Sequence, residues 1–201
     1  MSVEQRRALL IELLGDPDRL VQEAAAAALE KLESLLDLEQ IVRDLKADQR
    51  GQRVRAIYAM EHVQSSEIFP YLIDLLKDPD ADIRSAAVQV LGSKAHPKSL
   101  GSLVKHLKDP SPAVRVHTAE ALGHFQDPRL VAVLGSVLTS DDEQLVISAA
   151  RALGRQGVAE AQAPLLTLFK DTRPAVRVAA IEALSLVPFG ASSSRTQAPI
   201  H

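Results

Sequence analysis

Six histidines are the side chains of this 201-residue chain best suited to proton transfer or metal binding near neutral pH. They are His62, His96, His106, His117, His124 and His201. A metal site on a helix needs ligands about one turn apart, and no two of these histidines have that spacing with a carboxylate on the same face. Cysteine is absent, which excludes a cysteine nucleophile and a thiolate zinc site. The sequence therefore predicts no catalytic residue, no metal and no cofactor.

The charge balance and the apolar pattern restrict the class of partner. The formal net charge is −3, whereas a dedicated nucleic-acid binder is normally strongly basic. No apolar run approaches the length of a membrane span, and the N-terminal residues show no cleavage site of a secretory signal. We therefore expect a cytoplasmic protein that binds neither nucleic acid nor membrane.

The residues are organised by an internal repeat. The stretch 109–123, DPSPAVRVHTAEALG, recurs at 78–92, at 171–185 and more weakly at 140–154. An apolar residue before the arginine position marks each copy, at Val21, Val54, Ile83, Val114, Leu145 and Val176. The spacing settles at 31 after two irregular intervals. Self-similarity at a fixed period indicates a repeat architecture with six units, 1–34, 35–64, 65–95, 96–126, 127–157 and 158–189.

Each unit is expected to contain two helices joined by a short turn. The repeated stretch has apolar and small residues on one helical face, which predicts a second helix in each unit. Residues that can cap a helix precede it at Asp18, Asp80, Ser111 and Asp142. Glycines that can close it follow at Gly92, Gly123 and Gly154. A two-helix unit cannot bury its apolar face alone, so neighbouring units must stack.

The pattern DPxxxVRxxAAxALG resembles the short HEAT-like repeat that is also called the phycobilisome-lyase repeat. The likeness extends from about Val3 to Val187. It implies an all-α fold, an α-solenoid superhelix of about six two-helix repeats in residues 1–189. The remaining residues 190–201 lack the repeat pattern, are rich in serine, and are expected to be disordered.

The resemblance also implies a structural ladder of charged residues. In similar repeats the aspartate of the turn and the arginine of the second helix form this ladder along the stack. The matching residues are Asp78, Asp109 and Asp171, with Arg55, Arg84, Arg115 and Arg177. Gln22 and Val146 occupy arginine positions, so looser stacking is expected in the first and fifth units.

Stacking of the HEAT-like kind would place the open positions of the second helices on a concave surface. The partner-binding residues expected there are Ile57, Met60, Gln89, Val116, His117, Glu120, Ile147, Arg151, Val178 and Glu182. Exposed apolar area in a groove often marks a binding site. The alternative is that a tightly curved array packs these apolar residues against neighbouring units. His62 takes the leucine position of its unit, which predicts a half-buried packing role.

These expectations favour a non-catalytic scaffold that binds a protein or peptide on the concave surface. The alternative is an accessory subunit or enzyme of the phycobilin-lyase type, acting on a chromophore-bearing protein, for which the repeat resemblance is the only indication. The last helix ends in apolar residues with little polar cover, so self-association through the C-terminal end is also expected.

Overall fold

The computed structural model describes residues 1–188, and in this range all regular secondary structure is helical. The predicted all-α fold class, an α-solenoid, is therefore confirmed. The contacts divide the chain into two compact units, 1–94 and 95–201, which we call the N-terminal and the C-terminal unit. The expectation of disorder for 190–201 falls outside the described residues.

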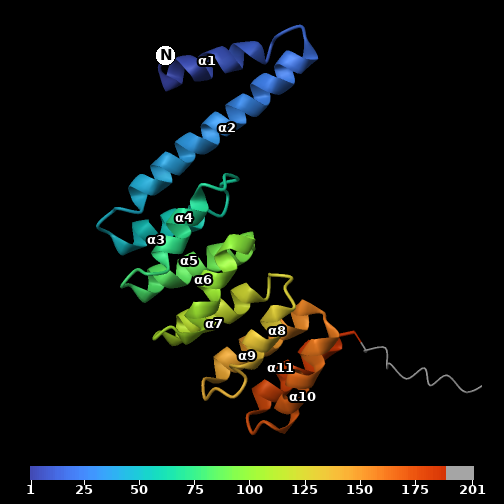
Figure 1. The fold of residues 1–201 in the computed structure, drawn as a ribbon. Coiled ribbons are helices and arrows are strands. Elements are labelled where there is room, and N and C mark those ends of the chain that lie inside the picture. Colours follow the sequence, from blue (N-terminus) through green and yellow to red (C-terminus); the bar gives the residue numbers. More distant parts are fainter. Residues whose placement is uncertain (189–201) are drawn as a thin grey trace, which may run out of the picture. The chain divides into compact units, whose positions relative to one another are not determined.

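The N-terminal unit contains three repeats (Figure 1). Its helices are α1 (Val3–Leu13), α2 (Arg19–Asp44), α3 (Arg50–Ala59), α4 (Ile68–Leu75) and α5 (Ala81–Lys94). The core is aliphatic and includes Ile57, Ile68, Leu72 and Ile83, all fully buried. Helix α1 lies against α2 and buries none of its own residues.

The C-terminal unit contains the other three repeats (Figure 1). Its α-helices are α6 (Leu100–Lys105), α7 (Pro112–Leu122), α8 (Arg129–Gly135), α9 (Glu143–Gln156), α10 (Gln162–Thr167) and α11 (Pro174–Ser185). Short 3-10 turns flank α6 and α10, at η1 (Pro97–Ser99), η2 (His106–Lys108), η3 (Ala159–Ala161) and η4 (Leu168–Lys170). Helix α9 packs between α7 and α11.

The repeat keeps one period along the whole described chain. The second helices begin at Arg19, Arg50, Ala81, Pro112, Glu143 and Pro174, so each start lies 31 residues after the previous one. This differs from the expectation for the second repeat, where Val54 was taken as the marker residue. The equivalent of Ile83 and Val114 is Gln52. The two irregular intervals in the sequence analysis therefore arise because the marker of the second repeat was placed two residues too late.

Helix α2 departs from the pattern of one helix per half-repeat. It runs unbroken for 26 residues, and the expected repeat boundary at 34/35 falls inside it. The segment 30–35, EKLESL, occupies the place where the later repeats turn, but it has no glycine or proline. Glutamate, lysine and leucine are good helix formers, so the second helix of the first repeat continues into the first helix of the next.

The repeat glycines differ in role: Gly123 is the C-cap of α7, as expected, whereas Gly92 lies inside α5 and Gly154 inside α9. A Cβ on Gly154 would lie 2.7 Å from the Cα of Ala183 on α11, and one on Gly123 would lie 2.8 Å from Nε of Arg155. Gly154 is inside α9, which ends instead at Gly157 with a left-handed φ of 61°. The expectation that Gly154 closes its helix was wrong, because adjacent second helices approach too closely for any side chain there.

Candidate interaction surface

A repeated turn precedes five of the six second helices; in the second repeat Ala47 takes the aspartate position. The residue at the aspartate position accepts a hydrogen bond from the backbone N–H two residues later, which satisfies a donor at the helix start. The acceptors are Oδ1 of Asp16, Asp78, Asp109 and Asp171, at 2.8 Å in each case, and Oγ of Ser140 at 3.1 Å. The aspartate therefore stabilises its own turn first.

The ladder arginines bind the backbone of this turn. Nη1 donates to the carbonyl oxygen six residues earlier, from Arg84 to Asp78 at 2.8 Å, from Arg115 to Asp109 at 3.0 Å and from Arg177 to Asp171 at 2.7 Å. The carboxylate that Arg115 binds through Nη2 belongs to the following repeat, at Asp142, 2.8 Å away. Arg115 thus connects two repeats of the C-terminal unit. Within its own repeat it binds the carbonyl oxygen of Asp109, and its carboxylate partner is in the next repeat.

The second repeat uses a different arginine from the one expected. Arg53 Nη1 lies 3.4 Å from Asp78 Oδ2, and both side chains are largely buried. Arg55 is exposed and makes no polar contact within the described residues. The assignment of Arg55 to the ladder was therefore wrong, for the same register reason, since Arg53 stands 31 residues before Arg84.

The two expected gaps in the ladder are filled by other side chains. Gln22 donates through Nε2 to the carbonyl oxygen of Asp16 at 2.7 Å, which is the contact that arginine makes elsewhere. Val146 is buried and cannot donate, but Arg173 of the next repeat donates to the carbonyl oxygen of Ser140 at 3.2 Å. The turn carbonyls of the first and fifth repeats therefore have side-chain donors, although Gln22 and Val146 replace the arginine.

Arg173 also donates two side-chain hydrogen bonds to Asp171, the aspartate of its own turn. Its Nε lies 2.9 Å from Oδ1 and its Nη2 lies 2.8 Å from Oδ2 of Asp171, a two-point contact. These side-chain hydrogen bonds, followed by the backbone N–H of Arg173, lower the pKa of Asp171 from 3.8 to about 2. The carboxylate is thus held in its charged form far into the acid range.

Three of the residues expected on an open surface are buried. Ile57 and Met60 are fully buried in the N-terminal unit, and Ile147 is 6% exposed in the C-terminal unit. With the register corrected, Ile57 and Met60 take the core positions that Val88 and Leu91 hold in the third repeat. Ile147 lies on α9, which packs against both α7 and α11. These three residues therefore belong to the packing between helices.

One column of the second helices stays accessible within each unit. In the second to sixth repeats we call the seventh residue, counted from the marker as the first, the outer column; it comprises Tyr58 and Gln89 in the N-terminal unit, and Glu120, Arg151 and Glu182 in the C-terminal unit. Tyr58, Glu120, Arg151 and Glu182 are exposed, and Gln89 is half-buried. The corrected register adds Tyr58, which sequence reasoning missed. Val116 and His117 are half-buried beside the column.

The outer column is ordered by contacts between successive repeats. Tyr58 Oη lies 3.3 Å from Oε1 of Gln89 in the N-terminal unit. In the C-terminal unit, Ser148 Oγ donates to Glu120 Oε1 at 3.2 Å, and Arg151 lies 3.8 Å from Glu182. The outer column is therefore polar and charged, and Val178 is the one exposed residue among the apolar residues expected on the open surface.

The outer face of α11 carries apolar side chains that remain exposed in the C-terminal unit. Val178 and Ile181 are 52% and 58% exposed, whereas Ile147 and Ala150, one repeat earlier, are 6% and 0% exposed. Helix α11 covers those earlier residues by packing on α9. Leu186, the C-cap of α11, is also exposed.

The five histidines that the structure describes belong to no cluster that could hold a metal ion. No group of three or more His, Asp or Glu side chains within residues 1–188 is arranged to hold a metal ion. His62 is exposed rather than half-buried, because Met60 takes the core position once the register is corrected. His106 Nδ1 lies 2.9 Å from the carbonyl oxygen of Ser102, a local contact within its helix.

Stacked two-helix repeats with a ladder of turn contacts define a helical-repeat protein. The HEAT-repeat family model matches residues 36–108, 69–151 and 133–197, so the chain belongs to the HEAT-repeat family. No helix within residues 1–188 has both the length and the apolar composition that a bilayer crossing requires. Comparison with curated protein sequences gives no match.

Solved structures share this fold at low sequence identity. The complex of CpcE and CpcF of phycocyanin lyase from Nostoc sp. PCC7120 contains a chain with a TM-score of 0.64 and 16% identity, covering 75% of this chain and 99% of its own. YibA of Escherichia coli gives 0.60 and 18%, covering 91% and 72%. An engineered protein gives 0.52 and 23%, covering 92% and 96%. Identities this low support the fold alone.

Proposed function

We propose that this chain is a non-catalytic scaffold that binds a protein or peptide partner through the second helices of its repeats. The observation that supports this most directly is the outer column, whose polar side chains stay accessible along the second helices, whereas Ile57 and Ile147 beside it are buried. Arg151 and Glu182 form an exposed ion pair at 3.8 Å within the column, so the column carries charges of both signs. Such a face favours recognition of a partner with complementary charge.

A charge-exchange variant tests this function. In Arg151→Glu combined with Glu182→Arg, the two residues can still form their ion pair, but the sign at each position is reversed. Affinity purification followed by mass spectrometry is expected to recover partners with the wild-type chain and lose them with this variant. The control is Arg43→Glu combined with Glu39→Arg, which exchanges an exposed ion pair of α2 outside the column. Equal partner sets from wild type and the column variant would contradict the proposal.

We also propose that the α11 face mediates association with a second copy of the chain. The supporting observation is the exposure of Val178 and Ile181 at positions that are covered in the preceding repeat. Apolar faces of this kind are normally buried by another element. We also propose a cytoplasmic location, which fits the absence of cysteine.

A further inference from the structure

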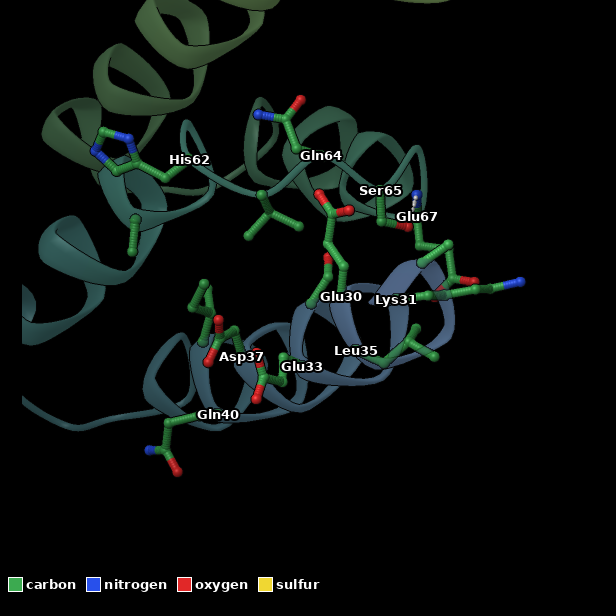
Figure 2. A pocket seen from close by; sticks show the side chains of 15 residues that line it. Glu30, Lys31, Glu33, Leu35, Asp37, Gln40, His62, Gln64, Ser65 and Glu67 are labelled. Carbon is green, nitrogen blue, oxygen red and sulfur yellow. Dashed lines mark hydrogen bonds between the residues drawn. The ribbon is translucent and has the colours of Figure 1, made fainter. Parts of the chain in front are cut away.

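The N-terminal unit has a cleft that the repeat pattern does not explain. It has a volume of about 800 Å³ and lies between α2 and the loop that leads from α3 to α4. Figure 2 shows Glu30 and Lys31 projecting from α2 on the side of the loop that carries Ser65 and Glu67. Volumes of this size are typical of ligand sites in proteins.

The cleft follows from the unbroken course of α2. In the later repeats the chain turns between the second helix and the next first helix, and the turn packs against its neighbours. Residues 30–35 stay helical instead, so the middle of α2 runs beside residues 62–67 without filling the space between them. The opening is therefore built into the one repeat junction that lacks a turn.

Carboxylates dominate the charge of this cleft. Glu30, Glu33, Asp37 and Glu67 line it, and Lys31 is the single lysine or arginine among the lining residues. Glu33 is paired with Arg7 at 3.0 Å. The other three carboxylates have no ion-pair partner within residues 1–188.

The cleft also offers apolar contact and an unused hydrogen-bonding group. Leu35 and Ile41 of α2 are half-buried in its wall, and Val63 is buried in the opposite loop. Ser34 lines the cleft as well, and its Oγ is buried without a hydrogen-bond partner among the described residues. A buried hydroxyl without a partner is unfavourable, and a bound ligand with a backbone N–H or carbonyl group would satisfy it.

We propose that this cleft binds a short segment of a partner protein that carries lysine or arginine side chains beside an aliphatic residue. The basic side chains would meet Glu30, Asp37 and Glu67, and the aliphatic residue would contact Leu35 and Val63. This site is separate from the outer column, and its failure would leave the proposed scaffold function untouched. A metal ion is a poorer fit, since no three acidic or histidine side chains in the described chain are close enough to coordinate one.

Fluorescence anisotropy with a labelled peptide, Ser-Arg-Leu-Ala-Lys-Leu-Ala-Arg-Ser, tests the proposal on the full chain. Binding is expected to weaken as salt rises, because it depends on exposed charges. Glu30→Gln combined with Glu67→Gln should weaken binding by ~5-fold or more, since two favourable ion pairs are lost. The matched control is Glu12→Gln combined with Glu160→Gln, which removes the same charge from exposed positions outside the cleft and should leave binding unchanged.

Two further peptides separate the contributions of charge and apolar contact. A peptide with citrulline for arginine and acetyl-lysine for lysine should lose binding, and one with serine for leucine should bind more weakly than the parent. Circular dichroism of each variant confirms that the helices remain. No binding of the parent peptide, or equal affinity for wild type and the cleft variant, would overturn the proposal. Equal binding of the serine peptide, or full displacement by spermine, would also overturn it in favour of a site for small cations.

Discussion

The guanidinium of Arg115 joins two repeats, with Nη1 3.0 Å from the carbonyl oxygen of Asp109 and Nη2 2.8 Å from the carboxylate of Asp142. Both side chains of the ion pair are mostly buried, with 23% and 18% exposed. Arg115→Ala removes the donor and leaves both acceptors short of a partner. We expect a loss of about 1–3 kcal/mol in the free energy of unfolding, measured by chemical denaturation.

Arg55→Ala is the matched control for this change. Arg55 has the sequence context of a ladder arginine but is exposed and makes no polar contact within the described residues. Its removal should change the free energy of unfolding by less than about 0.5 kcal/mol. If both variants were equally stable, the contacts of Arg115 would not contribute to the stacking of the repeats.

Acid stability should depend on Asp171. Its pKa is lowered to about 2 by Arg173, whereas the ordinary value is 3.8. A carboxylate with a lowered pKa in the folded state stabilises the fold above its ordinary pKa and loses that contribution as pH falls from about 4 to about 2. Asp171→Asn keeps an acceptor for the turn but removes the charge. Its unfolding midpoint should therefore fall less steeply than that of wild type across this pH range, as measured by thermal denaturation followed by circular dichroism.

Glu160→Gln provides the reference for this measurement, because Glu160 is exposed and has no ion-pair partner within residues 1–188. It should reproduce the wild-type slope. A wild-type slope in Asp171→Asn would show that the contact with Arg173 does not persist in solution.

Gly154 tests the close approach of α9 and α11. A Cβ at this position would lie 2.7 Å from the Cα of Ala183 and 2.9 Å from its carbonyl oxygen, and the backbone cannot move aside without separating the helices. Gly154→Ala should cost about 1–3 kcal/mol despite the better helix propensity of alanine. Gly101→Ala is the control, because a Cβ there meets nothing within 4 Å and should be neutral or stabilising. The measurement is chemical denaturation of both variants.

The sequence predicted the fold class because the apolar pattern recurs in every repeat, and capping residues or glycines mark most of the second helices. It misplaced the second repeat because Val54 and Arg55 imitate the valine and arginine of the motif, whereas the true equivalents are Gln52 and Arg53. A strict period of 31 counted from Ile83 would have found them. The same shift explains two further errors. Met60 is buried where an open position was expected, and His62 is exposed where a half-buried position was expected.

The accessible surface was harder to predict than the core. Ile147 and Ser148 occupy positions outside the main apolar stripe of their helix. They are nevertheless buried, because α9 packs between α7 and α11. How closely helices stack depends on pairs such as Gly154 and Ala183, which lie 29 residues apart in sequence. The cleft beside α2 depends on a helix that continues where a turn was expected, and its sequence signal is the run of good helix formers in 30–35.

The exposed face of α11 leads to the last prediction, on association between copies of the chain. Ile181 is 58% exposed at the position where Ala150 is fully buried by the next helix. If a second copy covers this face, light scattering should show a mass that rises with concentration for wild type, and Ile181→Glu should remain monomeric, since an unpaired carboxylate is costly to bury. Leu20→Glu places the same charge on an exposed leucine of the N-terminal unit and should associate like wild type. A wild-type chain that is monomeric at all concentrations would contradict association through α11.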